Sequence, residues 1–197
     1  HIKVKEMYWK KLLNWSKTPV SQKFILLEGS KVNLRTKKLE DAELDYEWRT
    51  DPEIAALDAT VPINISFSNY LAHFEDEIKY PVPWSIKFAI ETKGGRMIGN
   101  IMYYDIDPID KEAEIGIIIG DKKFLGKGYG PDALKTLLNY IFDTTDMAKL
   151  YLHTLTTNKR AQKAFKKIGF IEDRKVRRDG MNFVKLDIIR EDWQLAG

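Results

Sequence analysis

The sequence predicts an α/β domain built on a mixed sheet. The hydrophobic pattern of the amino-terminal half predicts a strand, two helices and then a three-stranded meander. The pattern of the last third predicts helices that alternate with strands. The 197 residues contain no internal repeat and no low-complexity tract. Hydrophobic residues make up 44% of the chain and aromatic residues 12%, which is enough for a sizeable core and excludes wholesale disorder.

The elements of the amino-terminal half follow from periodicity and from the residues that interrupt it. Period-two alternation predicts the strands, helical spacing predicts the helices, and Glu91–Gly95 has the composition of a hairpin turn. The predicted elements are a strand at 31–36, helices at 39–49 and 67–80, and strands at 84–90, 97–104 and 112–119.

The carboxy-terminal part is predicted by amphipathic spacing. Leucine, isoleucine and phenylalanine recur along one face of a helix at 132–142, and Gly169 is a suitable residue after the end of a helix at 159–168. Strands are predicted at 149–155, 170–172 and 182–189.

The first residues differ from the rest, so we divide the chain into an extension, 1–28, and a main domain, 29–197. Residues 5–16 fit a helical face before Thr18-Pro19 interrupts it. This helix is expected to pack on the domain or on a neighbouring subunit, which leaves a homodimer open; a membrane-surface helix is the alternative. His1 is not an initiating methionine, so we expect a tag remnant or a trimmed terminus at the start.

Composition narrows the class of protein further. The formal charge is +3, cysteine is absent, and the three histidines, at 1, 73 and 153, are too scattered to suggest a metal site. No apolar run approaches the roughly 20 residues that span a bilayer, and no signal peptide is evident. We therefore expect a cytoplasmic, metal-free protein with no nucleic-acid or membrane partner.

A glycine-rich loop between a buried strand and an amphipathic helix is the most informative stretch. Its glycines at 126, 128 and 130 allow successive backbone N–H groups to converge, and the helix amino terminus adds positive potential, which together suit a phosphate. The spacing does not fit a Walker loop, because Gly128 follows Lys127 where a hydroxyl residue is required. Pro131 likewise excludes a dinucleotide fingerprint.

Two motifs resemble the GNAT superfamily of acetyl-CoA-dependent N-acetyltransferases. The family pattern Gln/Arg-x-x-Gly-x-Gly/Ala is similar to Leu125…Gly128-Tyr129-Gly130, with Leu125 departing from the usual Gln or Arg. The second pattern, Asn-x-x-Ala/Ser followed by Tyr-x-Lys-x-Gly-Phe, is similar to Asn158…Ala161 and Phe165…Phe170. Trp48…Asp51-Pro52, Ile98-Gly99-Asn100 and Glu114-Ile115-Gly116 resemble the branch of ribosomal-protein alanine and spermidine acetyltransferases.

The resemblance implies a mostly antiparallel mixed sheet, flanked by helices, whose central strands splay apart. It implies acetyl-CoA as co-substrate, with its pantetheine arm along Ile117, Ile118 and Ile119. The pyrophosphate would lie over Leu125, Gly126, Lys127, Gly128, Tyr129 and Gly130. Asn158 would hydrogen-bond the arm, in addition to capping its helix, and Phe165 occupies the position of the family's tyrosine acid.

The implied reaction is transfer of acetyl to a primary amine by direct attack. An amine arrives largely protonated, so a base must remove a proton, and Glu114 is the best candidate, with Glu112 second. Phe165 cannot donate a proton to the leaving thiolate. Tyr103 and Tyr104 are candidate substitutes, as is Tyr151; proton transfer by the substrate or release of the thiolate to water are the alternatives.

The acceptor is left open as a peptide N-terminus, a polyamine or another small amine. Acidic residues at 75–77 and at 105, 107 and 110 suit a cation but also suit ordinary solvated faces. The rival interpretation is an acyl-CoA-binding module without turnover, which the losses at Leu125 and Phe165 would both accommodate.

Overall fold

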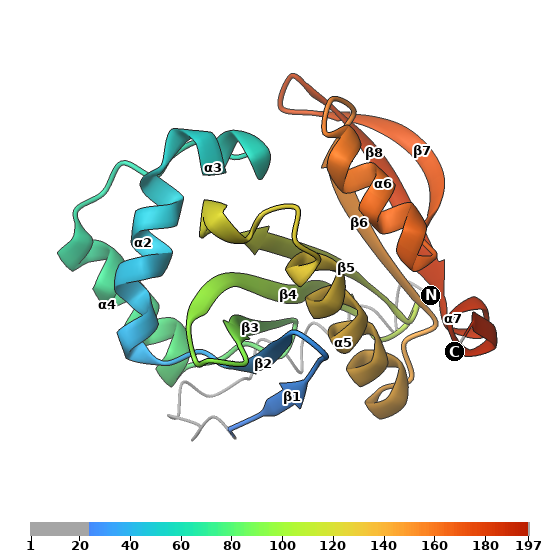
Figure 1. Cartoon of the computed structure of the whole chain (residues 1–197), viewed down its shortest axis with the longest axis horizontal. Coiled ribbons are helices and arrows are strands. Elements are labelled where there is room, and N and C mark those ends of the chain that lie inside the picture. The colour runs from blue at the N-terminus through green and yellow to red at the C-terminus, as the bar shows by residue number, and fades with distance from the viewer. Residues whose placement is uncertain (1–23, 197) are drawn as a thin grey trace.

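The computed structural model describes residues 24–196, which form one sheet with helices on both faces (Figure 1). The amino-terminal helix predicted at 5–16 lies outside the described residues. The strands are β1 (Leu26–Glu28), β2 (Val32–Thr36), β3 (Ser85–Thr92), β4 (Met97–Asp107), β5 (Glu112–Ile119), β6 (Lys149–Leu155), β7 (Ile171–Arg178) and β8 (Met181–Ile189). The α-helices are α2 (Ala42–Thr50), α3 (Pro52–Leu57), α4 (Phe67–Lys79), α5 (Tyr129–Thr144), α6 (Lys159–Ile168) and α7 (Arg190–Ala196), with 3₁₀ turns η1 (Leu39–Asp41) and η2 (Lys122–Phe124).

The sheet has the order β1-β2-β3-β4-β5-β6-β8-β7 and is antiparallel except where β5 meets β6. That parallel pairing covers only Glu112–Glu114 against Lys149–Tyr151. Beyond it β5 continues to Ile119 and β6 to Leu155 without pairing to each other, and Figure 1 shows the two strands diverging. The predicted fold class, a mostly antiparallel mixed sheet with splayed central strands, is confirmed.

The two faces of the sheet carry different layers. Alternation along each strand sends Ile115 and Leu152 into the main core with Leu134 and Leu138 of α5. The opposite face contacts the α2–α3 region, where Ala89 and Met97 pack on Trp48 and Ile54. Glu114 lies between Ala113 and Ile115, so its side chain is on this second face, away from α5.

The structure departs from the predicted elements in four places. Strand β1 pairs with β2, so the sheet begins at Leu26, before the predicted domain boundary at residue 29. Helix α3 follows Thr50-Asp51-Pro52, where the sequence predicts only the end of a helix. Asp51 caps α3 by accepting from the N–H groups of Glu53 and Ile54 at 2.8 and 3.2 Å, and Pro52 is favourable in a first turn. Strand β7 runs eight residues instead of three, and α7 follows the last strand.

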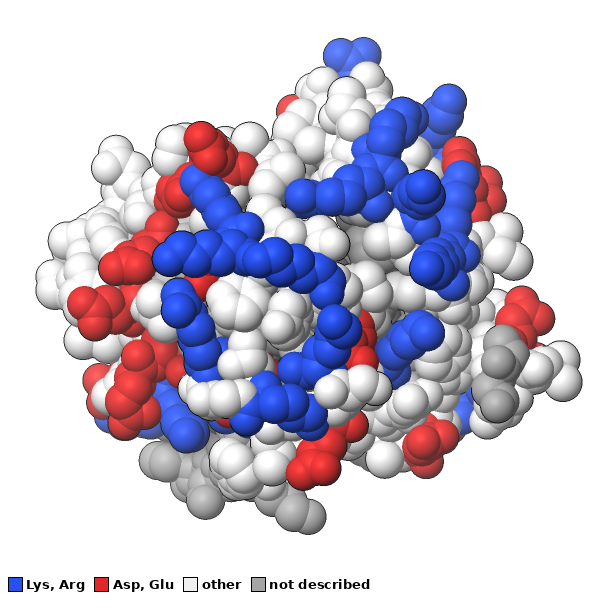
Figure 2. Space-filling model, in the orientation of Figure 1, with Lys and Arg blue, Asp and Glu red and all other residues white. Residues whose placement is uncertain are grey.

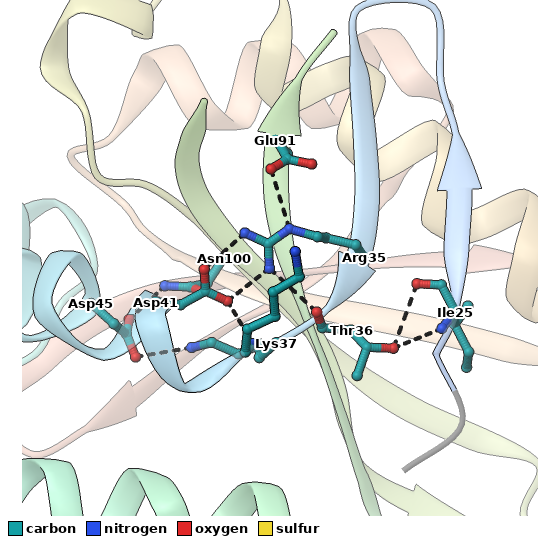
Figure 3. Close-up of polar contacts among 9 residues, drawn as sticks. Ile25, Arg35, Thr36, Lys37, Asp41, Asp45, Glu91 and Asn100 are labelled. Atoms are coloured by element: carbon teal, nitrogen blue, oxygen red, sulfur yellow. Dashed lines mark hydrogen bonds and ion pairs between the residues drawn. The ribbon is translucent and has the colours of Figure 1, made fainter. Parts of the chain in front are cut away.

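A buried polar network attaches the α2 layer to the sheet (Figure 3). Arg35 of β2 makes a bidentate ion pair with Asp41, at 2.7 and 2.8 Å. Asp45 of α2 accepts from Lys37 at 2.9 Å and from Asn100 of β4 at 2.6 Å. Burial opposes ionisation of Asp45, but the charges of Lys37 and its neighbours outweigh it and lower the pKa of this carboxyl. The network fixes the layer that covers one side of the site described next.

Candidate active site

A cavity of about 580 Å³ opens where β5 and β6 diverge, a size typical of cofactor-sized ligands. Its walls come from the end of β5, the glycine loop, the start of α5 and one side of α6. Ile117, Ile118 and Ile119 line it, and they lie on the stretch of β5 that β6 leaves unpaired. The cavity is therefore bounded by a free strand edge on one side and a helix amino terminus on the other.

The glycine loop has the backbone conformation that its composition indicates. Gly126 and Gly128 adopt φ angles of 72° and 85°, in the left-handed region that side chains disfavour. Gly128 is the N-cap of α5 and provides no side-chain cap, so that helix end is open to a ligand. Leu125, Gly126, Gly128 and Gly130 line the cavity, whereas Lys127 and Tyr129 belong to the loop without lining it. Such an open helix end suits a phosphate.

Helix α5 is held in place by residues 30–32, which lie about 100 positions earlier in the chain. The carboxylate of Asp132 accepts from the backbone N–H groups of Ser30, Lys31 and Val32, at 3.1, 2.7 and 3.0 Å. The Lys31 ammonium lies 5.5 Å from the centre of the Tyr129 ring and donates to the carbonyl of Lys127 at 3.3 Å. These contacts attach the β1–β2 turn to the first turn of α5 and so support the glycine loop.

The cavity has a basic rim. Lys135 of α5 and Arg160, Lys163 and Lys167 of α6 line it. Figure 2 shows Lys and Arg side chains on both sides of the hollow in this face. Concentrated positive charge next to an open helix end favours a ligand with several phosphate groups.

Two residues of the second motif link this cavity to a smaller one. Asn158 caps α6 by accepting from the N–H of Ala161 at 3.1 Å, which leaves its amide NH₂ as the group that can reach a ligand. Asn158 and Phe165 each line both cavities. The phenyl ring of Phe165 packs 6.2 Å from that of Phe170, so it belongs to a wall that is apolar on this side.

The smaller cavity, of about 230 Å³, contains the predicted base. Glu114 lines it, and its carboxylate is 8% exposed, so it is a buried acid and not a solvated strand residue. Oε1 of Glu114 lies 2.7 Å from Nδ1 of His153 on β6. Oε2 lies 3.9 Å from a guanidinium nitrogen of Arg178, at the end of β7. The second-choice base, Glu112, instead forms a 2.5 Å ion pair with Lys149.

The candidate tyrosines lie on opposite faces of the sheet. Tyr104 pairs directly with Glu114 in the β4–β5 register and lines the smaller cavity. Burial and the Glu114 carboxylate raise the pKa of the Tyr104 phenol. Tyr103, one position away, points into the main core. The structure therefore brings Tyr104 to Glu114 and keeps Tyr103 away from it, which corrects the expectation that either could serve.

Sequence reasoning did not single out three residues that line the smaller cavity, namely His153, Arg178 and Asp58. In the sequence His153 is one of three scattered histidines, and the pairing of β6 with β5 brings it to Glu114. Arg178 reaches the cavity because the Asp179-Gly180 turn, with φ angles of 48° and 78°, folds β7 back onto β8. Asp58, just after α3, lines both cavities; desolvation raises the pKa of its carboxyl to about 6, although the side chain also reaches solvent.

The large cavity combines an open helix end with a basic rim, and the small one contains a buried carboxylate beside a histidine. Residues 31–171 match the family model described as an acetyltransferase (GNAT) domain. The chain belongs to this family. The resemblance seen in the two sequence motifs is thereby confirmed.

Individual relatives agree with the family. A Bacillus subtilis protein that carries the name ribosomal N-acetyltransferase YdaF is 27% identical over 107 residues, 51% of this chain and 57% of its own. A spermidine N(1)-acetyltransferase of Vibrio cholerae is 30% identical over 87 residues, 44% of this chain and 50% of its own. The chain thus spans about half the length of these curated relatives.

The fold has solved counterparts. A crystal structure of spermidine N-acetyltransferase from Vibrio cholerae in complex with CoA and spermine superimposes with a TM-score of 0.74, at 21% sequence identity. The match covers 84% of this chain and 99% of that one. At this identity the likeness establishes the fold.

Two further observations concern the described residues only. Between residues 24 and 196, no group of three or more His, Asp or Glu side chains is arranged to hold a metal ion. The helices in the same range are too short or too polar to cross a bilayer.

Proposed function

We propose that this chain transfers acetyl from acetyl-CoA to a primary amine by direct attack, with Glu114 as the base. The observation that carries this proposal is the junction of the two cavities. The large one suits the coenzyme, the small one contains the buried carboxylate, and Ile117, Asn158 and Phe165 line both. A thioester at this junction would face an amine that enters the smaller cavity.

In the proposed reaction Glu114 accepts a proton from the amine. A primary amine such as that of lysine has a pKa near 10.4, and an α-amine about 8, so both arrive mainly as ammonium. Oε2 of Glu114 takes one proton, and the nitrogen lone pair attacks the thioester carbonyl carbon. Collapse of the tetrahedral intermediate breaks the carbon–sulfur bond and releases the thiolate. The second proton that nitrogen loses ends on the thiolate or on water.

Tyr104 enters this proposal as a neutral hydrogen-bonding group. An alkyl thiol has a pKa of about 8.5. Since the pKa of Tyr104 is raised above that of an ordinary phenol, transfer of its proton to the thiolate is unfavourable. The excess proton on the nitrogen of the intermediate is the more acidic source, which favours substrate-assisted protonation.

The charges around the smaller cavity limit which amines could be the acceptor. Glu114 and Asp58 are acidic, and they favour an amine that carries positive charge. Arg178 is basic and lies over Glu114, so the cavity is not uniformly acidic. We infer an acceptor whose reactive amine enters alone, such as a terminal amine on a longer molecule, and a peptide N-terminus or a polyamine end both meet this description.

The test is CoA release with a panel of amines: α-amino peptides, polyamines and aminoglycosides. We expect turnover with at least one class. Glu114→Gln should lower kcat about 100-fold or more, within the range of general base catalysis, and the loss should shrink as pH rises and free amine accumulates. Acetyl-CoA affinity, measured by calorimetry, should stay within about threefold of wild type.

The same assay separates the rival interpretation. Departures at Leu125 and Phe165 from the family pattern would also accommodate a binding module without turnover. Tight acetyl-CoA binding with no CoA release for any amine would support the module, and a fully active Glu114→Gln variant would refute the base. Absence of acetyl-CoA binding would refute both functions.

A further inference from the structure

The buried pair of Glu114 and His153 is the most unusual feature of the smaller cavity. Nδ1 of His153 lies 2.7 Å from Oε1 of Glu114, and the two side chains are only 6% and 8% exposed. The rings of Tyr151 and Phe183 stand edge-on to the imidazole, at 5.8 and 6.4 Å between ring centres. A hydrogen bond between buried groups is stronger than one at the surface.

The surroundings of the other imidazole nitrogen, Nε2, indicate which form of the His153 ring is favoured. Nε2 of His153 is buried and has no hydrogen-bond partner among the described residues. A doubly protonated ring would leave an N–H and a positive charge without an acceptor there, which is costly. The neutral ring with hydrogen on Nδ1 is therefore favoured, and it donates to the ionised carboxylate.

The two oxygens of the Glu114 carboxylate have different neighbours. Oε1 is occupied by His153, whereas the nearest cation to Oε2 is Arg178, at 3.9 Å. His153 thus holds one oxygen of a carboxylate that lines the smaller cavity, where the Tyr104 hydroxyl also hydrogen-bonds to Glu114. A base that is fixed in this way loses little rotational freedom when substrate arrives.

We propose that His153 is a positioning residue whose Nδ1–H holds Oε1 of ionised Glu114, so that Oε2 takes the proton from the acceptor amine. This inference rests on the proposed function, since it assigns a partner to the proposed base. His153 does not itself exchange a proton with the substrate. It sets the orientation and charge state of the residue that does.

Kinetics of two substitutions test the role. His153→Phe keeps a ring but removes the donor, and should lower kcat about 10-fold or more with little change in acetyl-CoA affinity. His153→Asn places an amide N–H near the position of Nδ1 and should recover most of that loss. His73→Phe, at an exposed site on α4, is the control for removing a histidine and should behave as wild type.

A pH profile separates positioning from a structural role. A donor favours the charged form of a carboxylate, so His153→Phe should move the acid limb of kcat/KM to higher pH, and His153→Asn should move it back. The other ionisable groups that face the pair are Tyr104 on β4, Tyr151 on β6, Arg178 on β7, Lys185 on β8 and Asp58 after α3. They are unchanged in both variants. Equal activity losses in the Phe and Asn variants, with an unmoved acid limb, would overturn the proposal.

A double-substitution cycle distinguishes failure of this inference from failure of the proposed function. If His153 acts through Glu114, His153→Phe should have little further effect in the Glu114→Gln background. A full, multiplicative loss there would overturn the pairing and leave the base role of Glu114 intact. A fully active Glu114→Gln enzyme would overturn both.

A spectroscopic readout needs no turnover. In ¹⁵N spectra at neutral pH, with the signal assigned by its loss in His153→Asn, the ring should be protonated at Nδ1. A neutral ring protonated at Nε2 would mean that Nδ1 accepts a hydrogen bond from a protonated Glu114 carboxyl. The carboxyl would then be an acid in the resting protein, and the proposal would be wrong even if acetyl transfer is observed.

Discussion

The backbone N–H of Lys31 donates a 2.7 Å hydrogen bond to the carboxylate of Asp132, which lies 101 residues further along the chain. The neighbouring N–H groups of Ser30 and Val32 donate to the same carboxylate. Hydrogen bonds to a charged acceptor are stronger than those between neutral groups, and these three join the β1–β2 turn to the helix that follows the glycine loop. The proposed phosphate site thus depends on a contact well outside it.

Removing that carboxylate should weaken both folding and coenzyme binding. Asp132→Ala deprives three N–H groups of their acceptor, and we expect a loss of about 1–3 kcal/mol in the free energy of unfolding, from denaturant titration. Acetyl-CoA affinity should fall as well, because the first turn of α5 loses its anchor. Asp143→Asn, exposed on the same helix, is the control and should leave both unchanged. Unaltered stability of Asp132→Ala would show that the anchor is not needed.

The positive φ of Gly126 can be separated from its role at the ligand site. An alanine there has no atoms within 4 Å of its Cβ, so the cost is the left-handed backbone, about 1–2 kcal/mol. Gly95, in the β3–β4 turn, has a φ of 81° and equally open surroundings. Both substitutions should lower stability by similar amounts.

Only Gly126→Ala should also lower the affinity for acetyl-CoA, by about 10-fold. The loop must shift to relieve the backbone strain, and its N–H groups then no longer point at the ligand. Isothermal titration calorimetry on the two variants gives the comparison. Equal affinities for Gly95→Ala and Gly126→Ala would remove the glycine loop from the coenzyme site.

The conformation of the glycine loop could be predicted from the sequence, but the residues that contact the proposed base, Glu114, could not. Local patterns suffice for Gly126 and Gly128, because φ preference and a following amphipathic helix are encoded by neighbouring residues. His153 is 39 residues from Glu114, and only the parallel pairing of β5 with β6 brings them together. Strand β7 carries charged residues without alternation, since as an edge strand it has little to bury, and so its length was underpredicted. A single sequence does not show which distant strands pair or in which register.

Asp58 should make recognition of cationic amines dependent on pH. Its pKa is raised to about 6 by desolvation, so the carboxylate is charged above that pH and its attraction for an ammonium group is lost as pH falls through 6. Because the side chain reaches solvent, the attraction is modest: Asp58→Asn should raise KM for a cationic amine about two- to fivefold at pH 8.

At pH 5 the same substitution should change KM little, since the wild-type carboxyl is by then mostly protonated. Glu43→Gln, exposed on α2 outside both cavities, should have no effect at either pH. Steady-state kinetics at the two pH values check this. A constant ratio of KM between Asp58→Asn and wild type would exclude a charge interaction with the acceptor.

Two adjacent tyrosines provide a matched test of the proton source. Tyr104→Phe removes a neutral hydroxyl beside Glu114 and should lower kcat only about two- to tenfold, less than the 10²–10⁴ expected for a full general acid. Tyr103→Phe removes a hydroxyl from the opposite face and should leave kcat unchanged. A loss above 100-fold in Tyr104→Phe, with stability intact, would make Tyr104 the acid after all.

Phe165 offers the reverse experiment, a gain of function. Its ring lines both cavities, at the place where the thiolate would be released, and a hydroxyl added there has cavity space to enter. A phenol with an ordinary pKa near 10 is a better proton donor to a thiolate than Tyr104, whose pKa is raised. Phe165→Tyr should therefore raise kcat, by about 10-fold if thiolate protonation limits the rate, with KM for the amine little changed.

The matched control for that variant is Phe165→Leu, which keeps the site apolar and should not raise kcat. Rapid-mixing measurement of the first turnover checks that the gain is in the chemical step and not in CoA release. If Phe165→Tyr binds acetyl-CoA normally but turns over no faster than wild type, protonation of the leaving group is not the slow step. The absence of the family's tyrosine would then carry no kinetic cost, because the nitrogen of the intermediate already supplies the proton.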